Sequence, residues 1–233
     1  MPFFGYTAVP LQVKAAISFI LAAALAPTAA LNIPATMTGV MPLAGAAIGE
    51  AAVGLAIGAA TLLILIGAEF AGTLIGLQMG FSSVTLFDPQ AEQETSIIGR
   101  LEYLLALTIF IALNGHHMLL TALGGSFSSI PLGGGVLGGQ TPLFFARLTS
   151  EVFVVAVKLA APVLAILLLT EIALGFISRA LPQMNVFVDS FPLKIGIGLT
   201  AMAVTWPLFV YVLSKSFDKF SASLVQMIGM MGR

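Results

Sequence analysis

The stretch GLQMGFSSVTLFDPQAEQE, which runs from Gly76 to Glu94, changes character part-way along. Aspartate can cap a helix whose first turn holds proline and acidic residues, so one interpretation starts a helix at Asp88. That interpretation leaves the preceding Met-Gly-Phe-Ser-Ser unexplained, because a helix has no need to change character there. The second interpretation is a non-helical segment, which survives at membrane depth only when it is buried in protein or lines a watery cavity.

The composition around this stretch is that of a membrane protein. Of the 233 residues, 59% are hydrophobic and 8% are charged, against roughly 45–50% and about 25% in soluble domains. The chain's own core could not bury so much apolar surface, so lipid or partner subunits must cover it. The net charge of −1 gives no basic patch for phosphates, which argues against nucleic acid as a partner.

The apolar segments predict an all-α integral membrane protein with about five or six long helices, several of them broken or kinked. Prolines and single charges interrupt most segments, and Ile195 to Ser214 is the one uninterrupted stretch of this length, with Pro207 inside it. The apolar stretch from Tyr103 to Phe127 is expected to break at Asn114-Gly115-His116-His117. A cleaved signal peptide is not expected, because further apolar segments follow the first at once. Gly124-Gly125 and the stretch from Ser126 to Thr141 are so rich in helix breakers that a connection is expected there.

Charges inside membrane helices normally face protein or water rather than lipid. Five charges argue on this ground for subunit or lumen contacts: Glu50, Glu69, Lys158, Glu171 and Lys194. All of them except Glu171 are candidate contacts with partner subunits. Small residues also recur every four positions at Ala68, Gly72, Gly76 and Gly80, and such a ridge lets another backbone approach closely. Two alternatives stay open for this ridge: packing within the chain, or packing against neighbouring subunits, which adds Gly72 and Gly76 to the candidate subunit contacts.

The sequence shows no signature of catalysis or of a bound cofactor. His116 and His117 are adjacent, so on a helix they point about 100° apart and cannot share a metal as residues four apart can. The glycines between 133 and 139 are not followed by the Gly-Lys-Ser/Thr of a phosphate-binding loop. We therefore expect neither an enzyme nor a cofactor or metal site.

Several motifs in one order resemble the FliR/SctT family of type III protein export gate subunits, and most of all flagellar FliR. These motifs are Gly76 to Ser83, Asp88-Pro89-Gln90, Asn114-Gly115-His116-His117, Ser126 to Gly133, Pro182 to Val188 and Phe191-Pro192-Leu193-Lys194. Any one of them alone would be weak, and their order makes the match specific. The chain departs from the family at its start, because Met1 to Val13 resembles the loop after the family's first helix, which is expected to be missing.

The resemblance implies a function that hydrophobic periodicity did not show. FliR-like proteins join FliP and FliQ subunits in a helical assembly, near FlhB and FlhA, at the base of the flagellum in the bacterial inner membrane. The assembly forms a closed conduit for unfolded flagellar proteins. The resemblance further implies a FliP-like helical part over residues 1–147 and a FliQ-like helical hairpin over residues 148–233.

The resemblance also implies that a pore plug aligns with Met79 to Ser96. Met79, Phe81 and Phe87 are expected to fill the closed pore, while the acidic end of the segment stays hydrated and movable. The candidate gate residues are Met79, Gly80, Phe81, Ser82, Ser83, Phe87, Asp88, Pro89, Gln90, Glu92 and Glu94.

Two other functions compete with this one. Within the family, the alternative is the injectisome subunit SctT. Outside it, a small-solute secondary transporter would also use broken helices and intramembrane charges, but it predicts two halves with matching interruptions. No convincing repeat of that kind is found, because Asn114-Gly115 and Pro162 have different surroundings.

Overall fold

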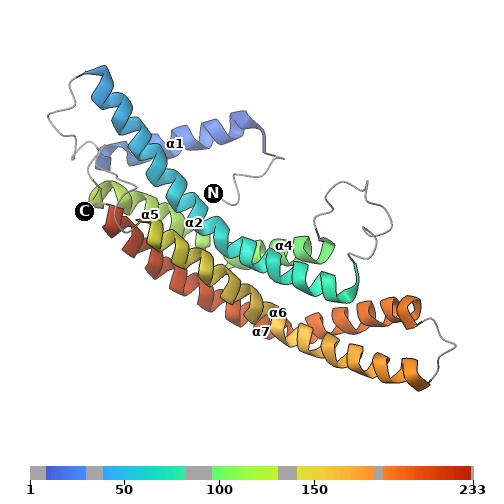
Figure 1. Ribbon diagram of the computed structural model, residues 1–233. Helices are drawn as coiled ribbons and strands as arrows, with labels where there is room; N and C mark the ends of the chain where they lie inside the picture. Colours follow the sequence, from blue (N-terminus) through green and yellow to red (C-terminus); the bar gives the residue numbers. More distant parts are fainter. Residues whose placement is uncertain (1–8, 30–38, 82–95, 131–140, 181–185, 232–233) are drawn as a thin grey trace. The chain divides into compact units, whose positions relative to one another are not determined.

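The computed structural model describes residues 9–29, 39–81, 96–130, 141–180 and 186–231 (Figure 1). Every regular element in these ranges is an α-helix, which confirms the all-α prediction. The elements are α1 (Leu11–Ala29), α2 (Val40–Met79), α4 (Ile97–Ala112), α5 (Gly115–Ser129), α6 (Thr141–Ala180) and α7 (Val186–Met231).

Three of these helices are much longer than a membrane crossing requires. α2 and α6 have 40 residues each and α7 has 46. At about 1.5 Å per residue they measure roughly 60–70 Å, twice the thickness of a hydrocarbon core. By length and composition all three can cross a membrane, and the bent pair of α4 and α5 adds a fourth crossing if it counts as one span. The chain is therefore an all-helical membrane protein.

The charges that interrupt the apolar pattern do not end the helices. α2 runs without a break through Glu50 and Glu69, and α6 runs through Lys158. A charged side chain keeps its backbone hydrogen bonds and can carry its head group to water or protein along its own stem. A hydropathy pattern that is interrupted at Glu50 and Glu69 therefore corresponds to one continuous helix.

The predicted break at Asn114 is confirmed. α4 ends at Ala112 and α5 begins at Gly115, with an angle of 67° between the two helices. Asn114 adopts the left-handed conformation with φ 56°, which asparagine tolerates better than most residues. A side chain at Gly115 would overlap the ring of Phe110, so this tight corner requires glycine there.

The connection predicted after Gly124 begins later than expected. Gly124 and Gly125 lie inside α5, which continues to Ser129, and residues 131–140 lie outside the described ranges. α5 packs on α1, and a β-carbon added at Gly124 would lie 3.6 Å from Cδ2 of Leu25. Tertiary packing of this kind overrides the low helix propensity of glycine.

The chain divides into two compact units, to both of which α2, α6 and α7 contribute. Unit 1 comprises Met1–Leu63, Phe110–Ser150 and Phe217–Arg233, and unit 2 comprises Ile64–Ile109 and Glu151–Ser216. The buried ring of Phe110 lies 5.2 Å from that of Phe217 within unit 1. The division at residue 147 is based on resemblance to FliP and FliQ rather than on contacts within the chain, and it stays a prediction.

Unit 2 is held together by backbones that approach one another closely. A β-carbon on Gly72 of α2 would lie 2.6 Å from the carbonyl oxygen of Ile98 in α4, and one on Gly99 would lie 2.6 Å from Oγ1 of Thr73. One on Gly76 would lie 2.9 Å from Oγ of Ser96. The glycine ridge therefore packs within the chain at Gly72 and Gly76, as the first alternative proposed, and their role toward partner subunits stays a prediction.

α6 and α7 form an antiparallel hairpin within unit 2. Glu171 near the end of α6 pairs with Lys194 near the start of α7. Further along, Leu159 and Val163 of α6 share a cavity wall with Met202 of α7. The residue numbers rise on one helix as they fall on the other, so the two helices run antiparallel. The FliQ-like nature of the hairpin stays a prediction.

We predict that Gly72→Ala destabilises the chain by about 1–3 kcal/mol, because the new methyl group overlaps the backbone of α4. The matched control is Gly54→Ala in the same helix, where nothing lies within 4 Å of an added β-carbon. The control should stabilise the chain by about 0.5–1 kcal/mol through helix propensity. Thermal unfolding of the purified chain in detergent measures both, and equal effects of the two substitutions would refute the close contact.

Candidate gate segment and its anchor

The end of α2 is a well-formed helix stop. Gly80 has φ +93°, its N–H donates to the carbonyl of Leu77 at 3.1 Å, and the N–H of Phe81 donates to the carbonyl of Gly76 at 3.0 Å. This pair of bonds is the Schellman motif, in which a left-handed residue after the last turn satisfies the free carbonyls. Glycine adopts that conformation without steric cost. The helix thus stops where the second interpretation of the sequence places the change of character.

The next described helix begins at a serine cap. The N–H of Gly99 donates to Oγ of Ser96 at 3.1 Å, and the N–H of Arg100 donates to the carbonyl of Ser96 at 2.8 Å. Serine is among the preferred residues at this position. Because Ser96 also lies against Gly76, the two helix ends that flank residues 82–95 are packed together.

Most of the predicted gate segment lies outside the described residues. These positions are Ser82, Ser83, Phe87, Asp88, Pro89, Gln90, Glu92 and Glu94. Of the three described positions, Gly80 and Phe81 are partly exposed, whereas Met79 is fully buried with its side chain against Gly198 of α7. In this chain Met79 therefore anchors the end of α2, and its role in a gate stays a prediction.

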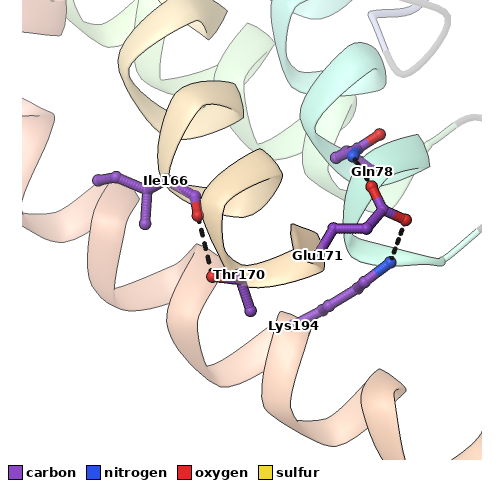
Figure 2. Close-up of polar contacts among 5 residues, drawn as sticks. All are labelled: Gln78, Ile166, Thr170, Glu171 and Lys194. Carbon is purple, nitrogen blue, oxygen red and sulfur yellow. Dashed lines mark hydrogen bonds and ion pairs between the residues drawn. The ribbon is translucent and has the colours of Figure 1, made fainter. Parts of the chain in front are cut away.

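A polar cluster fastens the last turn of α2 to the hairpin (Figure 2). Gln78 donates from Nε2 to Oε2 of Glu171 at 2.7 Å, and Lys194 donates from Nζ to Oε1 of the same carboxylate at 2.9 Å. The side chain of Lys194 is 15% exposed and that of Glu171 is 50% exposed, so water weakens the pair. One carboxylate thereby links α2, α6 and α7.

The other predicted subunit contacts differ in exposure. Glu50 in unit 1 and Glu69 in unit 2 are partly exposed, and Lys158 is exposed. The backbone carbonyl of Glu69 accepts a hydrogen bond from Oγ1 of Thr73 at 2.9 Å. All three side chains are thus open to a partner to some degree, and contact with one stays a prediction for each.

Sequence reasoning missed Gln78, whereas Glu171 was among the charges expected to face subunits or the lumen. Glu171 carried a signal, as an isolated charge in an apolar helix. Gln78 carried none, because a glutamine one residue before a helix stop is unremarkable. The contact between Gln78 and Glu171 depends on how α2, α6 and α7 are rotated about their axes, which a single sequence does not reveal.

The chemistry of the described residues is that of capping, pairing and close packing. They include no group of three or more His, Asp or Glu side chains placed to hold a metal ion. His116 and His117 are both exposed, with ring centroids 6.1 Å apart and planes inclined by 63°.

Long apolar helices, a glycine stop at the end of α2 and a serine cap at the start of α4, with these two helix ends in contact, define an α-helical membrane protein. A sequence model of the family described as "Bacterial export proteins, family 1" matches residues 1–220. The chain belongs to this family.

Individual relatives agree with the family match. The chain is 30% identical over 228 residues to the flagellar biosynthetic protein FliR of Escherichia coli (strain K12), which covers 97% of the chain and 86% of that relative. It is 30% identical over 186 residues to FliR of Bacillus subtilis (strain 168), covering 78% of the chain and 72% of the relative. It is 28% identical over 208 residues to FliR of Caulobacter vibrioides, covering 88% and 82% respectively. The predicted resemblance to FliR is confirmed.

We predict a small coupling energy between Glu171 and Lys194. In a double-mutant cycle with Glu171→Gln and Lys194→Met, the pair should contribute about 0.5–1 kcal/mol, because both groups are partly exposed. Unfolding of the purified chain in detergent gives the four values. The control is a second cycle that combines Glu171→Gln with Lys219→Met, a substitution of an exposed lysine. This cycle should show no coupling energy. A coupling energy equal to that of the control would contradict the anchor.

Proposed function

We propose that this chain is a subunit of the flagellar type III export gate in the bacterial inner membrane. It assembles with FliP and FliQ homologues, adjoins FlhB and FlhA homologues, and forms with FliP and FliQ a gated conduit for unfolded flagellar proteins. The observation that carries the proposal is the family match over residues 1–220. The relatives named above are all called flagellar biosynthetic proteins, which favours the flagellar assembly over the injectisome.

The exposed surface of the chain supports a role as one subunit among several. On α6, Leu169 is 66% exposed and Phe176 is 68% exposed, and on α7 Val204 is 72% exposed. Apolar side chains so exposed must meet lipid or another polypeptide. Helices twice as long as the hydrocarbon core leave a large share of this surface to other subunits.

The gate itself is proposed to be the segment from Met79 to Glu94. Its support is the position between two fixed helix ends, with Gly80 stopping α2 and Ser96 starting α4. Phe81 and Phe87 would supply the bulk that closes the pore, and the acids from Asp88 to Glu94 would keep the segment hydrated.

The assembly is tested by co-purification with tagged FliP and FliQ homologues. The unaltered chain should be recovered with both. Lys194→Ala should lower the recovery by up to about fivefold, since it removes a predicted subunit contact and leaves Glu171 without its cation. Lys219→Ala, on an exposed lysine outside the predicted contacts, should leave recovery unchanged. Absence of the unaltered chain from the complex would refute the proposed function, and full recovery of Lys194→Ala would refute the role of Lys194.

The gate is tested by deleting residues 82–93 and measuring ion leak through cells that express the complete gate. Removal of the plug should raise the leak, because nothing else in the proposal keeps the conduit shut. Co-purification of the shortened chain with FliP and FliQ shows whether the complex still forms. An assembled complex with an unchanged leak would rule out the plug.

A further inference from the structure

One oxygen of a buried carboxyl group in unit 2 has no hydrogen-bond partner. Glu102 of α4 is only 4% exposed, and its Oε2 is buried without any hydrogen-bond partner among the described residues. Native proteins leave few buried polar atoms unsatisfied, because the desolvation cost is then not offset. Arg100, two residues earlier on the same helix, lies 5.0 Å over the ring of Tyr103. The orphan oxygen of Glu102 therefore needs another explanation.

This carboxyl lines a cavity of about 430 Å³ enclosed by α4, α6 and α7. Its walls are mainly apolar and include Val163, Met202 and Phe209. The indole of Trp206 stacks on the ring of Phe209, with centroids 5.3 Å apart. Three lining residues, Leu101, Leu199 and Trp206, are 41%, 45% and 38% exposed, so the cavity opens to the surface of the chain.

These walls suit a primary ammonium group on an apolar stem. The carboxylate supplies the counter-charge, the aromatic faces attract a cation, and the apolar walls accept methylene groups. A bare metal ion is a poor occupant, because Glu102 is the only His, Asp or Glu among the described residues that line the cavity. A phospholipid headgroup is also disfavoured, because the described residues that line the cavity include no Lys or Arg to balance its phosphate.

The number of acceptors selects lysine over arginine. Oε2 of Glu102 is free, and the hydroxyl of Thr205 already donates to the carbonyl of Ala201 at 2.8 Å, which leaves its lone pairs available. A lysine ammonium has three donors on a narrow stem, whereas an arginine guanidinium brings five donors in a rigid plane. An arginine would thus bury donors for which the cavity has no acceptors.

We propose that the Glu102 cavity receives a lysine side chain from a neighbouring subunit. The inference rests on the proposed function, because it requires a multi-subunit gate. The exposed apolar rim of Leu101, Leu199 and Trp206 would be covered by apolar residues of the partner helix that carries the lysine. The carboxyl therefore costs stability in the free chain and contributes it in the assembly.

Because the carboxyl group has opposite effects on the stability of the free chain and of the assembly, a docking role can be separated from a structural one. Glu102→Met removes the unpaired oxygen, so it should raise the melting temperature of the purified full-length chain in detergent. The same substitution should lower the affinity for the FliP and FliQ subunits by at least about 30-fold, since it leaves the partner's lysine buried without its counter-charge. The control is Glu151→Gln, on an exposed glutamate of unit 2, which should change neither value.

The identity of the occupant is read by cross-linking. The chain has no cysteine, so Ala203→Cys places a single thiol among the residues that line the cavity. A reagent that joins a cysteine to an amine should capture a lysine of another subunit in the assembled gate. The same variant purified without the other subunits should capture none. Adding Glu102→Met to this variant should reduce the cross-link in proportion to the lost affinity.

The outcomes distinguish failure of this inference from failure of the proposed function. If the unaltered chain does not assemble with FliP and FliQ, the proposed function fails. If it assembles and Glu102→Met assembles equally well, the lysine proposal is overturned while the function stands. Capture of only an aminolipid, or of no amine at all, in an assembled complex overturns it too.

Discussion

The backbone contact between α2 and α4 is the constraint on which the arrangement of unit 2 depends. Gly72 and Gly99 face each other across it, and neither has room for a methyl group. This contact brings Ser96 against Gly76, so the start of one helix is fixed to the last turns of the other. On another side, Glu171 holds the same end of α2 through Gln78. The gate segment is thereby attached at both ends to a frame with little freedom.

The glycine ridge of α2 serves two purposes with one spacing. Gly72 and Gly76 lie four residues apart on the face toward α4, and the next member of the series is Gly80. That third glycine does not pack in the same way but takes φ +93° and ends the helix. A repeat that allows close packing thus also determines where packing stops. The position of Ser96, at the start of α4, against Gly76 follows directly from the ridge.

The sequence predicted the local features of the fold better than the contacts between its elements. The break at Asn114 and the stop at Gly80 were predictable, because both depend on the conformational preferences of the residues at those positions. The continuity of α2 through Glu69 was not predictable, because a charge lowers the local hydropathy whether or not the helix continues through it. Glu102 gave no signal, since a glutamate between arginine and tyrosine near a helix start usually faces solvent. Its burial depends on where α6 and α7 lie.

The length of the helices explains why a single chain would carry such features. A bilayer covers about 30 Å of an apolar helix, and α7 is more than twice that long. Lipid therefore cannot satisfy the exposed apolar residues along its whole length, and a bare helix in water would expose the remainder. A neighbouring subunit can present apolar side chains to exposed Val204 and a positively charged side chain to buried Glu102. A carboxyl oxygen without a hydrogen-bond partner in an apolar cavity is a defect in an isolated chain, but in the proposed assembly it would restrict which partner can dock and in which register.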